Sequence, residues 1–218
     1  MLKECRSVGV RLFGAATLAI LLVGCGGRGE ITDGGITTVR SPCPTVAVPA
    51  GTGDITLFDP PASRDATALD LTAVVGNLQS TCGDAGDQIV TTVTFDVEAR
   101  RTRTEAARTV DLPYFITVVR GGSAVVAKRI GRVQLNFPAG QARAKVTAQA
   151  STTVARAAAT LPEDVRRQLT RRRKAGEEDA AIDPLSQPEI RSAVLRASFE
   201  ALVGFQLTDA QLRYNATR

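Results

Sequence analysis

The middle of the chain alternates apolar and polar side chains, and this period of two constrains the fold more than any other feature. Val93, Phe95 and Val97 are separated by polar residues, and residues 142–150 repeat the pattern with alanine and valine. Successive side chains of a β-strand point to opposite faces of a sheet. Each run therefore predicts a strand with one buried face and one solvated face.

Four further runs have the composition of strands: residues 55–58, 69–73, 114–119 and 125–137. Gly121-Gly122 separates two of them and predicts a tight hairpin, because paired glycines readily take positive φ angles. Pro138-Ala139-Gly140 predicts another turn, and Gly131 predicts a bulge or bend inside its run. Six or seven antiparallel strands at this spacing predict a β-sandwich of immunoglobulin-like architecture over residues 42–156.

After the last strand run, the apolar residues recur with the spacing of helices. Capping-box patterns predict two helix starts, at Thr160–Glu163 and at Ser186–Glu189. The apolar positions of the two helices are Leu161, Val165 and Leu169 in the first, and Ile190, Val194, Leu195, Phe199, Leu202 and Val203 in the second. The second helix would end at Gly204, and Thr208–Gln211 predicts a third, short one. Residues 157–218 are therefore predicted to be helical, which makes the chain α+β, with the second helix packed on the sandwich or offered to a partner.

The first 25 residues have the layout of a secretory signal peptide, with a positive start, an apolar stretch and small residues before a cysteine. The apolar stretch, Leu12 to Val23, is too short to cross a bilayer, which takes about 20 residues. Leu22-Val23-Gly24-Cys25 resembles the lipobox of bacterial lipoproteins, and the resemblance is confined to residues 1–25. An ordinary signal peptide with a cysteine near its cleavage site is the alternative.

The resemblance implies that residues 1–24 are removed and that Cys25 is acylated, so that acyl chains hold the mature protein on a membrane. In this family an aspartate directly after the cysteine often signals retention in the inner membrane. Gly26 at this position implies the outer membrane and its periplasmic face. Residues 25–41 are rich in glycine and lack periodicity, which predicts a flexible tether between the anchor and the folded body.

Two cysteines remain once Cys5 is removed with the signal peptide and Cys25 is acylated. Cys43 and Cys82 are then a lone pair in an oxidising compartment, which predicts a structural disulfide. Such a bond would close a loop of about 40 residues and stabilise the fold by about 4 kcal/mol. A redox pair or a metal site is the alternative, but the chain has no Cys-x-x-Cys spacing and no histidine.

A basic cluster lies in and after the first predicted helix: Arg166, Arg167, Arg171, Arg172, Arg173 and Lys174. It could dock phosphate-bearing lipid head groups or an acidic protein. Glu177, Glu178 and Asp179 follow directly and offset half of its charge, so a solvated helix surface is the simpler interpretation. Nucleic acid is not expected as a partner, because a membrane separates it from the periplasm.

Two further polar clusters have simple structural interpretations. Gly83–Asp87 places two carboxylates in a glycine loop, but it lacks the further oxygen ligands of a calcium loop, so a turn is predicted. Arg100–Arg103 and Arg108 follow a strand, where cations at a sheet edge would block aggregation. Four carboxylates also lie close together in the sequence without any signal that fixes their geometry: Asp54, Asp59, Asp65 and Asp70.

The residues that commonly carry catalysis are missing from the sequence, since it has no histidine and no Ser-x-x-Lys or Gly-x-Ser-x-Gly motif. We therefore predict a protein without catalytic residues, cofactor or bound metal. Its predicted role is that of a structural or protein-interaction module of the cell envelope, with another envelope protein as partner. The alternative is a binding module for an envelope ligand such as peptidoglycan or lipid, which a concave pocket lined by polar groups would favour.

Overall fold

The computed structural model describes residues 30–32, 35–37, 41–171 and 182–217. It contains two compact units, Met1–Thr38 and Val39–Arg218. In the first unit, β1 (Glu30–Thr32) and β2 (Gly35–Thr37) pair antiparallel, so the predicted tether contains a short strand pair. Outside the described residues lie the predicted signal peptide, Cys25, Arg172, Arg173, Lys174 and the acidic residues Glu177, Glu178 and Asp179.

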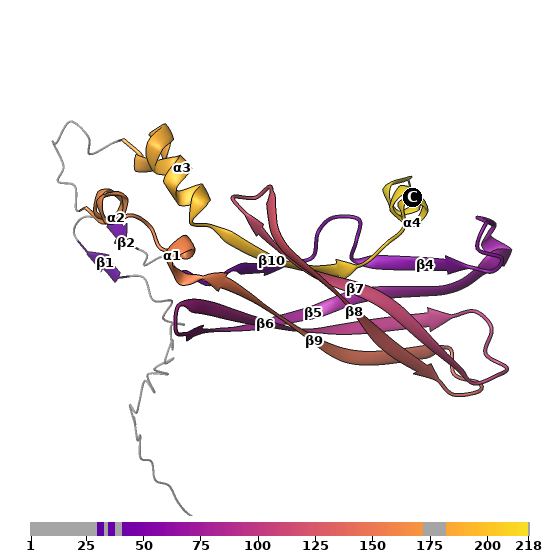
Figure 1. Ribbon diagram of the computed structural model, residues 1–218. Coiled ribbons are helices and arrows are strands. Elements are labelled where there is room, and N and C mark those ends of the chain that lie inside the picture. Colours follow the sequence, from indigo (N-terminus) through magenta and orange to yellow (C-terminus); the bar gives the residue numbers. More distant parts are fainter. Residues whose placement is uncertain (1–29, 33–34, 38–40, 172–181, 218) are drawn as a thin grey trace, which may run out of the picture. The chain divides into compact units, whose positions relative to one another are not determined.

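The second unit is built from two sheets that share a core (Figure 1). Among the described residues, one sheet has the strand order β3 (Thr45–Ala47), β10 (Phe199–Phe205), β7 (Arg108–Arg120), β8 (Ala124–Phe137). The other has the order β4 (Asp54–Phe58), β5 (Leu69–Ala85), β6 (Gln88–Arg101), β9 (Arg143–Ala155). All neighbouring strands of these two sheets are antiparallel except β3 and β10, which run parallel. The predicted α+β class with mainly antiparallel sheets is confirmed.

The alternation in the sequence builds the core between the two sheets. Val93, Phe95 and Val97 of β6 are fully buried, and their cluster includes Leu112 of β7 and Leu135 of β8 from the other sheet. Full burial of a side chain of this size stabilises the fold by about 1.5–3 kcal/mol relative to its exposure. The sandwich-like packing therefore follows directly from the period of two, and every strand predicted from that period is present.

Glycines with positive φ angles lie in the tight turns between strands that are consecutive in the chain. The β7–β8 turn contains Gly121 and Gly122, with φ angles of 62° and 80°. Gly140, between β8 and β9, has a φ angle of 77°. A side chain is strained in this region of backbone space, whereas glycine adopts it without cost from a Cβ. Both turn predictions are confirmed.

Gly131 does not mark a bulge, contrary to the sequence prediction. It pairs in regular register with Tyr114, and the shift in the β7–β8 ladder falls at Val118/Val119 instead. A Cβ at Gly131 would lie 2.5 Å from the Tyr114 ring, so the glycine leaves room for that ring. The Tyr114 ring packs edge-on against Phe95 in the core, with 5.2 Å between the ring centroids.

The helices of the described residues are η1 (Ala66–Ala68), α1 (Arg156–Ala159), α2 (Glu163–Thr170), η2 (Pro184–Ser186), α3 (Pro188–Arg196) and α4 (Asp209–Thr217). The predicted apolar stripes of α2 and α3 pack on each other, since Val165 is buried with Ile190 and Ala193. This face of α3 therefore covers α2, whereas the sequence suggested the sandwich or a partner. No helix in this part of the chain has both the length and the apolar character that a bilayer crossing requires.

The second predicted helix is wrong beyond Arg196. Phe199–Phe205 forms β10, which pairs with β7 over seven residue pairs and with β3 along its other edge. In the sequence, Phe199 and Val203 have helical spacing, but alternate residues of this segment are buried in the structure. The two flanking strands satisfy the backbone N–H and C=O groups of β10 on both edges, and this pairing stabilises a strand over the predicted helix.

Neither of the two predicted capping boxes forms. Thr160 Oγ1 donates a hydrogen bond to a carbonyl oxygen of α1, and Ser186 Oγ donates to the carbonyl oxygen of Asp183. Neither side chain caps the helix that follows it. A capping box is present at the start of α4, the predicted third, short helix. There the N–H groups of Thr208 and Gln211 each donate to a side-chain oxygen of the other residue, at 2.8 and 3.3 Å.

Candidate functional site

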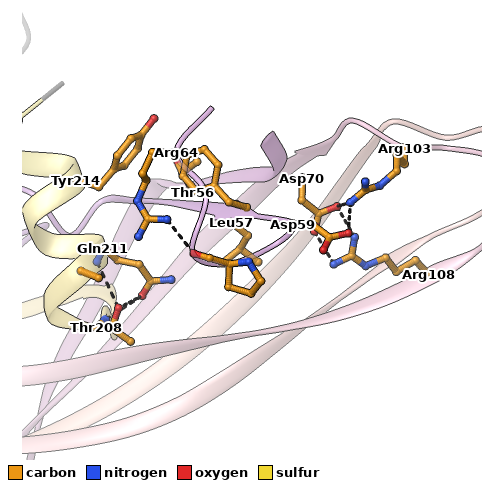
Figure 2. Close-up of a pocket in the computed structure, with 13 residues that line it drawn as sticks. Thr56, Leu57, Asp59, Arg64, Asp70, Arg103, Arg108, Thr208, Gln211 and Tyr214 are labelled. Atoms are coloured by element: carbon orange, nitrogen blue, oxygen red, sulfur yellow. Dashed lines mark hydrogen bonds and ion pairs between the residues drawn. The ribbon is translucent and has the colours of Figure 1, made fainter. Parts of the chain in front are cut away.

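A pocket of about 590 Å³ lies between β4, the segment that follows it, the β6–β7 loop and α4 (Figure 2). Strand β4 contributes apolar side chains to its wall, and the loops and the helix contribute polar ones. Its charged and polar lining side chains are Thr56, Asp59, Arg64, Asp70, Arg103, Arg108, Thr208, Gln211 and Tyr214. Because these residues come from three distant parts of the sequence, residues 56–70, 103–108 and 208–214, only the tertiary fold brings them together.

A network of arginines and aspartates forms one side of this pocket. Asp70, in β5, is buried, and Arg108, in β7, donates to both of its carboxylate oxygens at 2.7 and 2.8 Å. Arg103 forms an ion pair with Asp59 and approaches Asp70 Oδ1 at 3.5 Å. The bidentate arrangement fits the planar guanidinium group, and such charge-assisted pairs are about twice as strong as neutral hydrogen bonds.

This network keeps Asp70 ionised. The hydrogen bond from Arg108 is the main reason that the pKa of Asp70 lies below its ordinary value, although burial of the carboxyl group opposes the shift. The same contact raises the pKa of Arg108. A carboxylate held in this way accepts hydrogen bonds and attracts cations near neutral pH, but it is not a proton donor. Its ion pair contributes stability near neutral pH that is lost as the pH falls below about 4, where a free aspartate becomes protonated.

Arg64 and two aromatic rings form the opposite side of the pocket. The Arg64 guanidinium lies 5.1 Å from the centroid of the Phe58 ring and donates to the carbonyl oxygens of Pro61 and Ser63. Phe58 also meets the ring of Tyr214 edge-on, at 5.3 Å between centroids. Within the described residues, Arg64 forms no ion pair with a carboxylate, and its side chain is exposed. This cation is therefore available to an anionic group that enters the pocket.

Helix α4 is fastened beside the pocket by Asn215. The side-chain amide of Asn215 donates to the carbonyl oxygens of Gly51 and Asp54, each at 2.9 Å. The capping box of the same helix fixes its first turn. The pocket wall that α4 provides is thus held by contacts to the residues that precede and begin β4.

The arginines at and beyond the end of β6 are not edge charges, so that sequence prediction is wrong. β6 lies between β5 and β9 in the interior of its sheet. Arg101 is buried, with 3% of its surface exposed, and its guanidinium group lies 5.2 Å from the centroid of the Phe137 ring. That group donates four hydrogen bonds of 2.7–3.2 Å, to the carbonyl oxygens of Thr104, Ala106, Pro138 and Gln141. The neighbouring Arg103 and Arg108 line the pocket instead.

The structure gathers only part of the predicted acidic group. Asp59 and Asp70 both contact Arg103 at the pocket. Asp65 lies outside the pocket lining and accepts a hydrogen bond from Ser63, and the backbone of Asp54 receives the Asn215 amide. The proximity of these aspartates in the sequence was a real signal, but their arginine partners were not recognised.

A second buried aspartate was not among the site residues predicted from the sequence. Asp96 of β6 accepts hydrogen bonds from Lys145, Thr147 and Asn77 at 2.7–2.8 Å. These contacts, led by the one from Lys145, lower the pKa of Asp96 from 3.8 to about 2. Asn77 has a left-handed φ angle of 48° and lies at the register shift of β5. Because Asp96 is occupied by three partners, this cluster holds the irregular part of β5 against its neighbours.

The described members of the basic cluster, Arg166, Arg167 and Arg171, do not line the pocket. Arg166 forms an ion pair with Glu163 on the same helix, and Arg167 is exposed. Arg171 follows the end of α2, and the other three members of the cluster are not described. None of the described cations of this cluster lines the pocket. The solvated and the docking interpretations of this cluster therefore both stay predictions.

The turn predicted at residues 83–87 is confined to Gly86 and Asp87, because Gly83, Asp84 and Ala85 pair with β6 as the end of β5. Gly86 takes a positive φ angle of 65° between β5 and β6. Asp84 forms an ion pair with Arg156 at 2.9 Å, and the carbonyl oxygen of Asp87 accepts a hydrogen bond from the Arg156 N–H. Among the described residues, no three His, Cys, Asp or Glu side chains come together in a way that could hold a metal ion.

The predicted disulfide between Cys43 and Cys82 is present. Their Cα atoms lie 6.1 Å apart, and the two cysteines are separated by 39 positions in the sequence. Cys43 precedes β3 and Cys82 belongs to β5, so the bond links the two sheets where the chain enters the second unit.

Comparison of the chain with profiles of known families, with characterised proteins and with solved structures finds no match.

Proposed function

We propose that the protein is a non-enzymatic interaction module of the cell envelope, anchored on the periplasmic face of the outer membrane by acyl chains on Cys25. The observation that carries the proposal is the disulfide between Cys43 and Cys82, because disulfides persist in oxidising compartments such as the periplasm. The lipobox-like sequence that ends at Cys25 supports the same location. The expected partner is another envelope protein, and nucleic acid is not expected.

The pattern of contacts around the buried carboxylates supports a role without catalysis. Asp70 and Asp96 are each engaged by several donors, and their pKa values are lowered. A general acid near neutral pH needs the opposite shift. We also propose that the sandwich is immunoglobulin-like in architecture; two packed, mainly antiparallel sheets with chain crossings between them support this comparison.

The second candidate function is the binding of an envelope ligand, and the pocket in Figure 2 favours it. Its volume of about 590 Å³ lies within the range of small-molecule sites, roughly 300–1,000 Å³. Arg64 and Arg103 offer donors to a carboxylate or phosphate group, and the Phe58 and Tyr214 rings offer an apolar surface beside them. The free carboxylates of peptidoglycan peptides match this chemistry.

The anchor is tested by the substitution Cys25→Ser in cells fed an alkyne-labelled fatty acid. The wild-type mature protein should carry the label and fractionate with membranes. The variant should carry none and accumulate as an unprocessed precursor or as a released periplasmic form, because acyl chains are the proposed attachment. A mature wild-type protein that takes up no label contradicts the proposal.

The pocket is tested by co-sedimentation of the protein with isolated peptidoglycan sacculi. Arg64→Gln should weaken binding about tenfold, since a hydrogen bond to a charged group contributes about 1.5–3 kcal/mol. Arg213→Gln is the matched control, because Arg213 is an exposed cation on α4 that does not line the pocket. Equal binding by both variants and the wild type would exclude ligand recognition through Arg64.

A further inference from the structure

The N-terminal tether enters the second unit beside the β7–β8 turn. Ser41 and Cys43, at the start of this unit, line the same pocket of about 500 Å³ as Gly121 and Gly122 of that turn. The sixteen residues from Cys25 to residue 40 could span at most about 55 Å if fully extended. If Cys25 carries acyl chains, the β7–β8 turn therefore belongs to the end of the second unit that is tied to the membrane.

Exposed apolar and cationic side chains gather at this end of the molecule. Val125 and Val126 of β8 are 63% and 52% exposed, and Leu195 of α3 is 47% exposed. Together with the exposed cations Lys128, Arg191 and Arg196, these three residues form a surface that we call the turn-end surface.

The β7–β8 turn and α3 contact each other, so the turn-end surface is continuous. The N–H of Gly121 donates to the carbonyl oxygen of Ser198 at 3.0 Å, and a Cβ on Gly121 would lie 3.3 Å from the carbonyl oxygen of Leu195. Arg191 and Arg196 line one pocket together with residues of the turn. Figure 1 shows α3 beside the turn and α4 toward the other end of the sheets.

No described carboxylate pairs with the cations of the turn-end surface. In the part of the chain that the structure describes, Lys128, Arg191 and Arg196 take part in no ion pair. Lys128 lies 4.9 Å from the centroid of the Phe115 ring, and Arg196 donates to the Ser192 hydroxyl group. Arg120, in the same region, donates to the carbonyl oxygen of Arg196. The acidic side chains nearest to Arg191 and Arg196 in the sequence are Glu189 and Glu200, and the four cations of this region outnumber them.

We propose that the turn-end surface docks on an anionic lipid bilayer and so orients the anchored protein, an inference that rests on the proposed anchoring through Cys25. Aliphatic side chains flanked by Lys and Arg are the composition of surfaces that lie at a membrane interface, where the apolar groups enter the head-group region and the cations meet lipid phosphates. A second copy paired along the exposed edge of β8 would bring like charges together, which disfavours this chain as its own partner. The position of the tether selects the lipid surface from the remaining partners.

The test uses the Cys25→Ser protein without residues 1–24, which lacks both the acylation site and the apolar signal stretch. It is mixed with vesicles of phosphatidylcholine with or without one quarter phosphatidylglycerol. The protein should sediment with the anionic vesicles at low salt and be released in 0.5 M salt, because screening weakens attraction between exposed charges. Substitution of Lys128, Arg191 and Arg196 by glutamine should reduce binding at least tenfold, since each cation near an anionic surface contributes about 1 kcal/mol. Val125→Ser with Val126→Ser should also reduce binding.

The matched control replaces Arg100, Arg143 and Arg213 by glutamine, which changes the net charge equally at exposed positions outside the turn-end surface. Control binding should stay within twofold of the parent protein, and all variants should keep its melting temperature. The proposal would be overturned if both triple variants lost vesicle binding equally, or if the parent protein did not bind anionic vesicles at low salt. It would also be overturned if the turn-end surface bound an acidic protein but did not bind these vesicles. Fatty-acid labelling of the wild type reports on Cys25 separately, so a failed anchor and a failed surface give different results.

Discussion

Arg101→Met is expected to lower the free energy of unfolding by about 3–5 kcal/mol, because it removes the four hydrogen bonds that a buried guanidinium group donates to carbonyl oxygens of two loops. The guanidinium group connects the β6–β7 loop with the turn between β8 and β9. Methionine has a similar length and no charge, so the variant keeps much of the packing and removes the hydrogen bonds. Urea unfolding with a two-state fit measures the difference.

Arg100→Met is the control for this substitution, because Arg100 is exposed on the same strand and its removal should change stability by less than about 0.5 kcal/mol. Arg101→Lys should fall between the two, since an ammonium group cannot reproduce the planar fork of donors. If Arg101→Met proves as stable as Arg100→Met, then the four carbonyl groups find other partners and Arg101 does not organise the loops.

Removal of the disulfide by Cys43→Ala with Cys82→Ala is expected to cost about 4 kcal/mol, from the entropy of closing a loop of 39 positions in the unfolded chain. For a chain of this size, that loss corresponds to a fall in melting temperature of roughly 8–16 °C. The bond also ties the segment before β3 to β5, and β3 is only three residues long. Calorimetry of the double variant and of the reduced wild type measures the effect.

Ser80→Ala, an exposed substitution on β5, is the control for the double variant and should leave the melting temperature unchanged. Alkylation in denaturant provides an independent measurement, because the oxidised protein should expose no reactive thiol at either position. Two freely alkylated thiols in protein isolated from the periplasm would contradict both the bond and its contribution to stability.

The candidate site was only partly predictable from the sequence. The aspartates were noticed because they lie within a short stretch, yet a linear sequence gives no sign that Asp70 faces Arg108 or that Phe58 meets Tyr214. Such contacts depend on how strands from two sheets and a C-terminal helix converge. The arginines after β6 were misinterpreted for the same reason, since a charged run in a sequence looks alike whether it is solvated or buried among carbonyl groups.

What the sequence by itself determined is local. The alternation around Phe95 predicts strands because side-chain direction repeats every two residues, the paired glycines at 121 and 122 predict a turn because of their φ angles, and two cysteines left alone predict a bond. Each of these predictions depends only on neighbouring residues in the chain or on the number of cysteines, so each can be made without knowledge of the fold.

Only the tertiary structure decided between alternatives that the local signals left equal. Phe199–Phe205 has apolar residues at both helical and strand spacings, and it is a strand because β3 and β7 pair with its two edges. Arg101 is buried because carbonyl groups from two distant turns surround its guanidinium group. Backbone pairing between distant segments and the cost of leaving buried polar groups without partners act only once the chain is folded.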